Sequence, residues 1–344
     1  MKWPCSKCLS LFFFSKNNFS SSEYFLFCPI SYIIQAMRRI LHYTIKPSED
    51  GMTIHNYLSA QGYSHAVFVQ LKKTSHGIEV NDTWYYVNDR LHTGDHLRIT
   101  LEESASSLQI QPVSMPLDIV FEDEDILVIN KPSDMPVHPS MNHYDHTLAN
   151  GVMHYFTSQN IQHTFRCVNR LDRDTTGLTL IAKNMLSSAI LSRQITHREI
   201  HRTYLAIAQG EVPASGIIDA PIARRPGSTI ERMVNDAEGE RAVTHFKRID
   251  YQNSLSLVAL QLETGRTHQI RVHMKHIGHP LIGDFLYNPE SSLMNRQGLH
   301  SFMLTFSHPI TGADMTFYAP LWDDMKAFFP DYSNEQLIRV ISDF

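Results

Sequence analysis

Short apolar runs recur along most of the chain, and turn-forming or charged residues bound each of them. Three clear examples, each of strand length, are ILVIN at 126–130, LTLIA at 178–182 and SLVALQL at 256–262. Helical patterns lie between some of these runs but not between others, so the chain has no regular strand–helix–strand rhythm. This irregular order favours an α+β fold over a doubly wound parallel sheet.

The chain has 344 residues, enough for two or three domains, and its 42% hydrophobic content is typical of a globular protein with a sizeable core. Residues 1–36 differ from the rest, with nine aromatic residues, seven serines and only four charged residues. Their apolar runs are too short for a membrane-spanning helix or a signal peptide. We expect a leader that does not fold, or an upstream extension before a start at Met37.

Residues 37–102 have the pattern of a small separate module. Helices are predicted over 51–62 and 67–77, and Gly62 and Gly77 end them. Short strands are predicted at three places: 78–82, 85–90 and 91–101, the last with a Gly-Asp turn between two strands. A polar, proline-bounded linker follows at 103–115.

A larger domain is predicted over 116–330, followed by a C-terminal tail at 331–344. A hairpin is expected over 119–132, because two apolar strands flank an acidic turn there. The helices expected in this domain are at 146–156, 184–197 and 266–278.

The stretch RLDRD at 170–174 places four charges of alternating sign directly before a buried strand. Turn-forming residues follow at 175–177, so the charged residues should lie on a loop that the strand fixes at one end. A carboxylate such as Asp172 would be rigid and accessible there, as a nucleophile or a general base must be. The alternative is a solvated turn in which the arginines and aspartates pair with one another.

The formal net charge is −5, so a polyanionic partner would have to meet a local basic surface. The segment 264–280 provides one, since it has no acidic residue and contains Arg266, Arg271, Lys275 and four histidines. Arginines flanking the apolar stripe of a helix can meet a carboxylate or a phosphate. The histidines are spaced so that only neighbouring pairs share a helical face, which argues against a metal site.

Two further stretches combine basic residues with strands. In HRTYLAIAQG, Arg202 precedes Tyr204, so a phenol projects near a cation, although a buried tyrosine with a satisfied hydroxyl would look the same. In NKPSDMPVHP, Lys131 stands at the end of an apolar strand on a stiff, proline-rich loop.

Four stretches, NKPSDMPVHP, RLDRDTTGLTLIAK, HRTYLAIAQG and TGRTHQIRVHMKHIGHPLIGD, occur in an order and spacing that resemble the RluA-type family of pseudouridine synthases. This family isomerises selected uridines in ribosomal or transfer RNA. The module resembles the α-L RNA-binding domain that often precedes the catalytic domain. The resemblance implies an α+β catalytic domain on a mixed, largely antiparallel sheet with a central cleft, preceded by a small α/β RNA-binding module.

The resemblance also implies roles for individual residues. Asp172 would be catalytic, Arg271 its ion-pair partner and Tyr204 the active-site tyrosine, while attack on the ribose by Asp172 and proton abstraction both stay open. Asn169 and Asp134 depart from the histidine and glycine that are frequent in the family, which leaves details of RNA contact open. RNA contact is expected from Arg170, Arg173, Lys131, Arg202, Arg266, His268, Lys72 and Lys73.

The implied activity is isomerisation of uridine in structured RNA, with large-subunit ribosomal RNA preferred and transfer RNA as an alternative. No metal, organic cofactor or membrane is implied, and we expect a monomer. The four cysteines fit a reducing cytoplasm better than a disulfide scaffold. A non-catalytic ribosome-assembly factor is the alternative from another class, against which intact Asp172, Tyr204 and Arg271 argue. A glycosidase would need a second carboxylate facing Asp172, and no motif supplies one.

Overall fold

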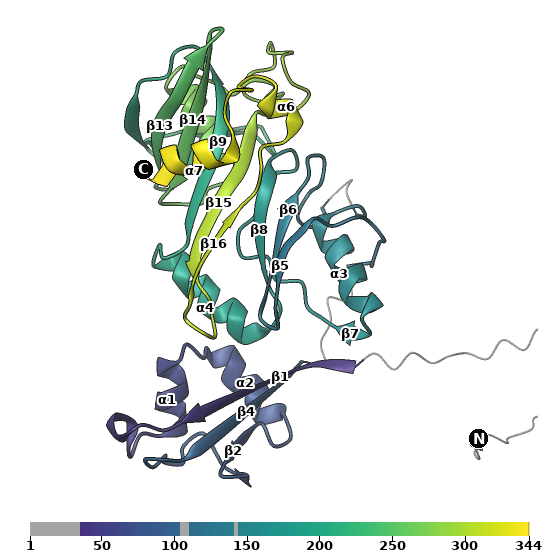
Figure 1. Ribbon diagram of the computed structural model, residues 1–344, viewed down its shortest axis with the longest axis vertical. Coiled ribbons are helices and arrows are strands. Elements are labelled where there is room, and N and C mark those ends of the chain that lie inside the picture. Colours follow the sequence, from purple (N-terminus) through teal and green to yellow (C-terminus); the bar gives the residue numbers. More distant parts are fainter. Residues whose placement is uncertain (1–34, 104–109, 141–143, 343) are drawn as a thin grey trace, which may run out of the picture. The chain divides into compact units, whose positions relative to one another are not determined.

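A computed structural model describes residues 35–103, 110–140, 144–342 and 344, in two larger sheets and a separate hairpin (Figure 1). The predicted leader at 1–36 lies outside these residues except for Gln35 and Ala36. These two belong to strand β1 (Gln35–Thr44), so the boundary predicted at residue 37 is corrected. Among the described helices, none has the length and apolar composition that crossing a bilayer requires.

The first sheet has five strands and forms the N-terminal module, in the order β3-β2-β4-β1-β7. Its other strands and helices are β2 (Ile78–Val80), β3 (Thr83–Trp84), β4 (His96–Glu103), β7 (Ile161–Gln162), α1 (Ile54–Ala60) and α2 (His65–Lys73). Both helices were predicted, and Thr53 caps α1 by accepting a hydrogen bond from the backbone N–H of Asn56 at 3.2 Å. The strand predicted at 85–90 is wrong, because the Asp89 carboxylate accepts the Tyr86 backbone N–H at 2.7 Å and turns the chain.

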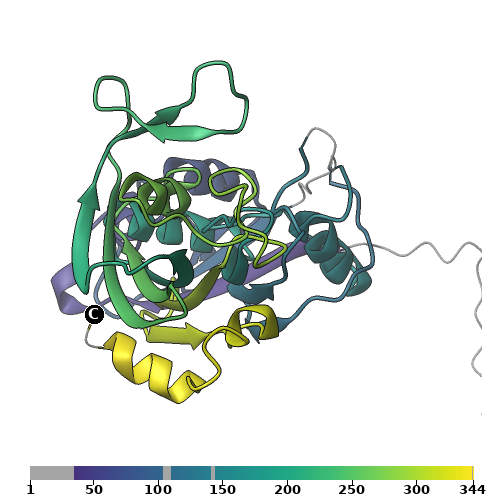
Figure 2. The same cartoon turned by 90° about the horizontal axis from the view of Figure 1, so that it is seen from above.

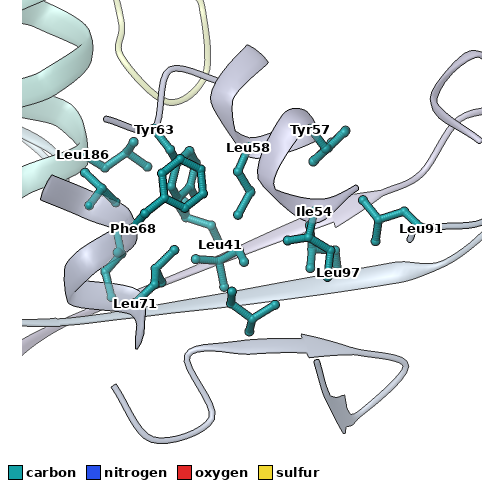
Figure 3. Close-up of a cluster of buried hydrophobic side chains, with 14 of the residues drawn as sticks. Leu41, Ile54, Tyr57, Leu58, Tyr63, Phe68, Leu71, Leu91, Leu97 and Leu186 are labelled. Atoms are coloured by element: carbon teal, nitrogen blue, oxygen red, sulfur yellow. The ribbon is translucent and has the colours of Figure 1, made fainter. Parts of the chain in front are cut away.

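The module has its own hydrophobic core between the helices and the sheet. Ile54, Leu58 and Phe68 point from the helices toward Leu97 of β4 (Figure 3). The same cluster includes Leu186 of helix α4 (Met185–Thr196), and strand β7 extends the sheet from the far side of the linker. The module and the larger domain therefore share part of a core.

The second sheet has nine strands and forms the larger domain. The main path runs β10-β13-β14-β9-β15-β8-β6-β5, and β16 pairs with β15. The pairing of β15 with β8 is parallel and every other strand pairing along this path is antiparallel, as the predicted mixed, largely antiparallel sheet requires. The strands are β5 (Ile119–Glu122), β6 (Ile126–Lys131), β8 (Thr176–Ala182), β9 (His201–Gln209), β10 (Ser215–Asp219), β13 (Val243–Gln252), β14 (Leu255–Leu262), β15 (Leu299–Ser307) and β16 (Asp314–Tyr318).

A separate antiparallel hairpin, β11 (Ile222–Arg224) with β12 (Arg232–Val234), lies between β10 and β13 in the sequence. It projects from the rest of the chain in Figure 2, where it is the green hairpin at the top. Each of its strands has only three residues, too few for a periodic pattern to predict the hairpin.

Helices complete the larger domain: α3 (Leu148–Ser158), α4 (Met185–Thr196), α5 (Gln269–His276), α6 (Asp323–Lys326) and α7 (Asn334–Ser342). Asn184 caps the helix predicted at 184–197, because its side chain accepts the Ser187 backbone N–H at 2.8 Å. The tail predicted at 331–344 contains α7, whose Leu337 and Ile341 are buried against the sheet. This segment is therefore part of the domain's core, which corrects the prediction.

Candidate active site

The loop that carries Asp172 is anchored to strand β8 by a buried amide. Asn169 accepts the Leu180 backbone N–H at 2.7 Å and donates to the Leu178 carbonyl at 3.0 Å. Asn169 is 2% exposed, so this departure from the family pattern concerns the support of the loop and not contact with RNA. The buried amide of Asn169 holds the start of the loop in a fixed position against β8.

Gly177 sets where the loop enters the sheet. Its φ is +106°, and a Cβ at this position would overlap the backbone of Ser301 on β15. Only glycine fits a left-handed position with a neighbouring strand so close. The parallel pairing of β8 with β15 therefore requires glycine at position 177.

Asp172 and Arg271 are brought together from distant parts of the chain. Nη1 of Arg271, on α5, donates to Oδ2 of Asp172 at 3.0 Å. The Asp172 side chain is 26% exposed, whereas that of Arg271 is 3% exposed. The carboxylate is thus open to a ligand on one side and held by a buried cation on the other.

Asp284 holds the opposite edge of the same guanidinium. Nε and Nη2 of Arg271 donate to the two oxygens of Asp284 at 2.7 and 2.8 Å, and Asp284 is fully buried. Burial alone would lower the pKa of Arg271, but the hydrogen bonds to Asp284 and the charge of Asp172 outweigh it, so the pKa is raised. Sequence reasoning missed Asp284, although it lies in the quoted stretch HPLIGD as the one carboxylate after the basic helix.

His268 approaches Asp172 from the start of α5. Its φ of +58° is left-handed, and its Nε2 lies 3.9 Å from Oδ2 of Asp172. The hydroxyl of Tyr287 accepts the Arg232 backbone N–H at 2.9 Å and also forms a hydrogen bond with Nδ1 of His268 at 2.9 Å. Burial lowers the pKa of His268, with partial compensation by the charge of Asp172, and this favours the neutral ring.

Tyr204 lies on β9 within the same cleft. It is 4% exposed, and burial raises the pKa of its phenol. A phenol in this state is neutral near pH 7 and can stack or donate a hydrogen bond.

These residues line a cleft of about 700 Å³, which we call the catalytic cleft. It contains residues of the Asp172 loop, β9, the end of β14 and the start of α5. The predicted central cleft is therefore present. Its lining residues used below are Arg170, Asp172, Arg202, Tyr204, His268 and Arg271.

The basic residues predicted to contact RNA differ in whether they have protein partners. Arg170 is exposed at the cleft, and Nε of Arg202 is buried without a hydrogen-bond partner among the described residues. Arg173 is paired with Asp174 through three contacts of 2.9 to 3.1 Å. Arg266 is likewise paired, with Glu240 and with the Arg241 carbonyl.

Lys131 does not have the predicted position for RNA contact, and this prediction is wrong. The residue is fully buried, and its ammonium donates to the carbonyls of Pro132, Met135 and Arg173 at 2.7 to 2.9 Å. Burial lowers its pKa to about 7. Lys131 ties the proline-rich loop to the Asp172 loop, because an apolar strand carries it into the interior.

Asp134 on the same proline-rich loop explains the second departure from the family pattern. Its φ is +53°, in the left-handed region where glycine is favoured and aspartate is tolerated. Its side chain is 86% exposed and lies 3.7 Å from Arg173. The substitution therefore keeps the turn and adds an exposed carboxylate beside a basic residue.

Three of the four histidines of the 264–280 segment, His268, His273 and His279, have protein partners. Both ring nitrogens of His273 contact protein oxygens, and His279 contacts the Gln209 carbonyl at 3.0 Å. In the described part of the chain, the group with metal-ligand geometry is instead Asp123, Asp125 and His308. Those carboxylates already bind backbone amides, Arg39 and His308, which accounts for the cluster without an ion.

An accessible carboxylate beside a buried cation, a neutral phenol and a neutral imidazole can act on an electron-deficient sugar carbon. The glycosidase alternative needs a second free carboxylate beside Asp172. Among the described residues, Asp284 is buried and bound by Arg271. Glu263 lines the cleft but is held by Arg198, Arg241 and His245. With basic residues around the cleft, the fold and site define an RNA-modifying enzyme that works on one nucleoside.

Comparison with known proteins gives the family. Residues 125–276 match the family model described as RNA pseudouridylate synthase. The chain is 40% identical over 276 residues to "Uncharacterized RNA pseudouridine synthase YjbO" of Bacillus subtilis, covering 80% of this chain and 97% of that protein. It is 41% identical over 256 residues to "Ribosomal large subunit pseudouridine synthase D" of Escherichia coli strain K12, covering 68% and 77%.

Among solved structures, "Human RNA Pseudouridylate Synthase Domain Containing 1" is similar, with a TM-score of 0.54 and 25% identity, covering 67% of this chain and 97% of that chain. The chain belongs to the RluA-type family of RNA pseudouridine synthases. It is an isomerase that converts uridine in RNA to pseudouridine.

Proposed function

We propose that the enzyme modifies large-subunit ribosomal RNA. The observation that carries this proposal is the 41% identity to "Ribosomal large subunit pseudouridine synthase D" of Escherichia coli over 256 residues. Transfer RNA is the alternative substrate, since the shape of the RNA around the target decides site choice.

We propose Asp172 as the catalytic carboxylate. The reaction breaks the bond from N1 of uracil to C1′ of ribose, turns the base, joins C5 to C1′ and releases the proton of C5. N1 gains a proton, so the uridine is isomerised without any co-reactant. The partly exposed Asp172 can attack C1′ or remove a ribose proton, and in both routes its charge stabilises the electron-deficient sugar.

Arg271 would hold the Asp172 side chain in one orientation, because Asp284 fixes its guanidinium. Its positive charge would favour the ionised carboxylate of Asp172. Tyr204 would stack on the uracil or donate a hydrogen bond to it. Its raised pKa makes it a poor phenolate base for the final proton loss. His268 would form a hydrogen bond through Nε2 with the nucleotide beside Asp172.

The RNA has to reach this cleft with its target base out of the stack. Arg170 and Arg202 are the proposed main contacts with phosphates, because neither has an ion-pair partner among the described residues. Arg173 and Arg266 would contribute less while their aspartate and glutamate partners hold them. Lys72 and Lys73 of the module would add contacts away from the cleft.

We propose that the module that begins with β1 at Gln35 and extends to about residue 102 binds RNA, and that 116–330 form the catalytic domain, which α7 completes. A monomer would suffice, because residues of one chain form the whole catalytic cleft. A cytoplasmic location suits both the ribosomal substrate and the free thiol of Cys167.

The test is to map pseudouridines in cellular RNA with and without the gene. One or a few sites in large-subunit RNA should lose the modification, and the wild-type gene should restore it, while a gene carrying Asp172→Asn should not. Loss of pseudouridine in transfer RNA alone would reject the ribosomal substrate and leave the reaction standing.

A further inference from the structure

The N-terminal module contains a second hollow, with a volume of about 620 Å³. The end of α2, the turn after it and residues 84–87 line it. We call it the aromatic groove, and the lining residues used below are Lys72, Lys73, His76, Trp84, Tyr85 and Tyr86. It shares no lining residue with the catalytic cleft.

Two aromatic rings are displayed side by side in this groove. The Tyr85 backbone N–H donates to the Ile78 carbonyl at 3.2 Å, and the Tyr85 ring packs against the module's core. Because side chains of an extended segment alternate in direction, Trp84 and Tyr86 face the other way. They are 51% and 62% exposed, and their ring centroids are 4.4 Å apart. Adjacent exposed aromatic rings of this size indicate a surface that a ligand covers.

The charges around the groove favour an anionic ligand. Lys72 and Lys73 are exposed in the last turn of α2, and neither forms an ion pair with another described residue. The nearby carboxylate of Glu79 is buried and paired with Arg98 and His76, so it does not neutralise the lysines. Stacking rings beside unpaired cations match the bases and phosphates of a nucleic acid strand.

We propose that the aromatic groove binds an unpaired segment of the substrate RNA, with bases on Trp84 and Tyr86 and phosphates at Lys72 and Lys73. The inference rests on the proposed function only in taking RNA as the substrate. An RNA duplex would offer phosphates but keep its bases inside the helix, where the rings cannot reach them. A purely apolar protein partner would leave both lysines unpaired at the contact.

Direct evidence for stacking would come from the fluorescence of Trp84. The chain has three tryptophans, so Trp3→Phe with Trp322→Phe leaves Trp84 as the only one. A single-stranded oligoadenylate of about ten nucleotides should quench this fluorescence, whereas an RNA duplex of equal length should not. Quenching by neither RNA, or equally by both, would overturn the proposal.

Affinity measurements separate stacking from charge. Trp84→Ala should raise the Kd for the oligoadenylate about tenfold, and Trp84→Phe should retain most of the affinity. Tyr251→Ala, at a ring that is 41% exposed on β13, is the control and should change nothing. Replacing Lys72 and Lys73 by Gln should lower the log–log salt slope by about 1.4, because each single-strand phosphate contact contributes about 0.7. Lys46→Gln is the matched lysine control in the same module.

Turnover distinguishes failure of this inference from failure of the proposed function. The Trp84→Ala enzyme should show a raised KM for its RNA, because the groove binds the substrate but shares no lining residue with the catalytic cleft. Unchanged Kd and salt slope in these variants, with normal kcat, would reject the groove and leave the enzyme assignment intact. A change in oligomeric state on Trp84→Ala would instead identify the groove as a contact between two copies.

Discussion

The catalytic cleft and the aromatic groove have similar volumes, about 700 and 620 Å³. They differ in whether their charged side chains are bound by other protein groups. In the cleft, the charged groups around Asp172 are held by other protein groups, so their directions are fixed before RNA arrives. In the groove, the two lysines have no ion-pair partner among the described residues, and Trp84 and Tyr86 contact each other while more than half of each side chain stays exposed. Fixed charge suits a place where a bond must break, and free charge with stacking surface suits a place that only holds RNA.

The largest effect expected from this comparison is at Asp172. Asp172→Asn keeps the shape of the side chain but cannot act as a nucleophile or a base, so turnover should fall about a thousandfold or more. The Kd for RNA should stay within about threefold of wild type, because the groove and the basic rim are unchanged. Single-turnover assays and filter binding measure the two quantities. Equal losses in both would mean that cleft and groove are not separate in function.

Asp284→Asn tests whether the fixed direction of Arg271 matters. The change leaves a buried guanidinium with half of its support, so the free energy of unfolding should fall by about 3 kcal/mol. Turnover measured below the unfolding transition should also fall. Asp324→Asn is the matched control, because Asp324 binds Arg296 in the same two-contact geometry while its own side chain is 46% exposed. Equal turnover in the two variants would show that Asp284 does not position Arg271 for catalysis.

Acid should weaken the domain that contains the cleft. His300 on β15 is buried and contacts Thr176 at 2.8 Å and the Ala319 carbonyl at 3.0 Å, and burial lowers its pKa to about 4. The unfolded chain takes up this proton near pH 6.5, so it binds more protons than the folded chain between about pH 6.5 and 4.

Stability should therefore fall as the pH drops through that window, by up to about 3 kcal/mol from this one group. Urea unfolding at several pH values measures it, with His300→Gln as the comparison. If acidification lowers the free energy of unfolding of His300→Gln as much as that of the wild-type protein, His300 does not cause the loss of stability in acid.

The smallest expected effect is a difference in the Kd for RNA between variants of two arginines at the cleft. Arg202→Gln should raise the Kd for RNA about tenfold, because Arg202 lines the cleft and forms no ion pair with another described residue. Arg266→Gln should cost about threefold or less, because Glu240 already neutralises this cation. Fluorescence anisotropy with the same labelled RNA compares them. A larger loss at Arg266 would mean that its pair with Glu240 opens when RNA binds.

Sequence reasoning found the parts of the site that local chemistry defines. A charged loop before an apolar strand predicted an accessible, rigid Asp172, and the loop is rigid because Asn169 and Gly177 fix it. The pattern of residues also predicted both helices of the module and helix α4, whereas the largely antiparallel sheet was implied by the family resemblance. These elements have strong periodicity or clear end signals.

What the sequence could not predict depends on contacts between distant segments. Asp284 is one aspartate among many until α5 turns Arg271 toward it, and β1 is recognisable only from its pairing with β4. Lys131 looked like a surface cation because lysine is rarely fully buried, yet three carbonyls hold it inside. Helix α7 is amphipathic but short, so its burial depended on a surface that the rest of the chain builds.

The most direct test of the account is release of the C5 hydrogen of uridine. Purified enzyme would be mixed with large-subunit ribosomal RNA carrying tritium at C5, transcribed without modifications. Because C5 exchanges its hydrogen for the bond to C1′, the account predicts one tritium released per pseudouridine formed by the wild-type protein. Asp172→Asn should release none above background. Tritium release by the Asp172→Asn protein at the wild-type rate would contradict the central claim that this carboxylate performs the chemistry.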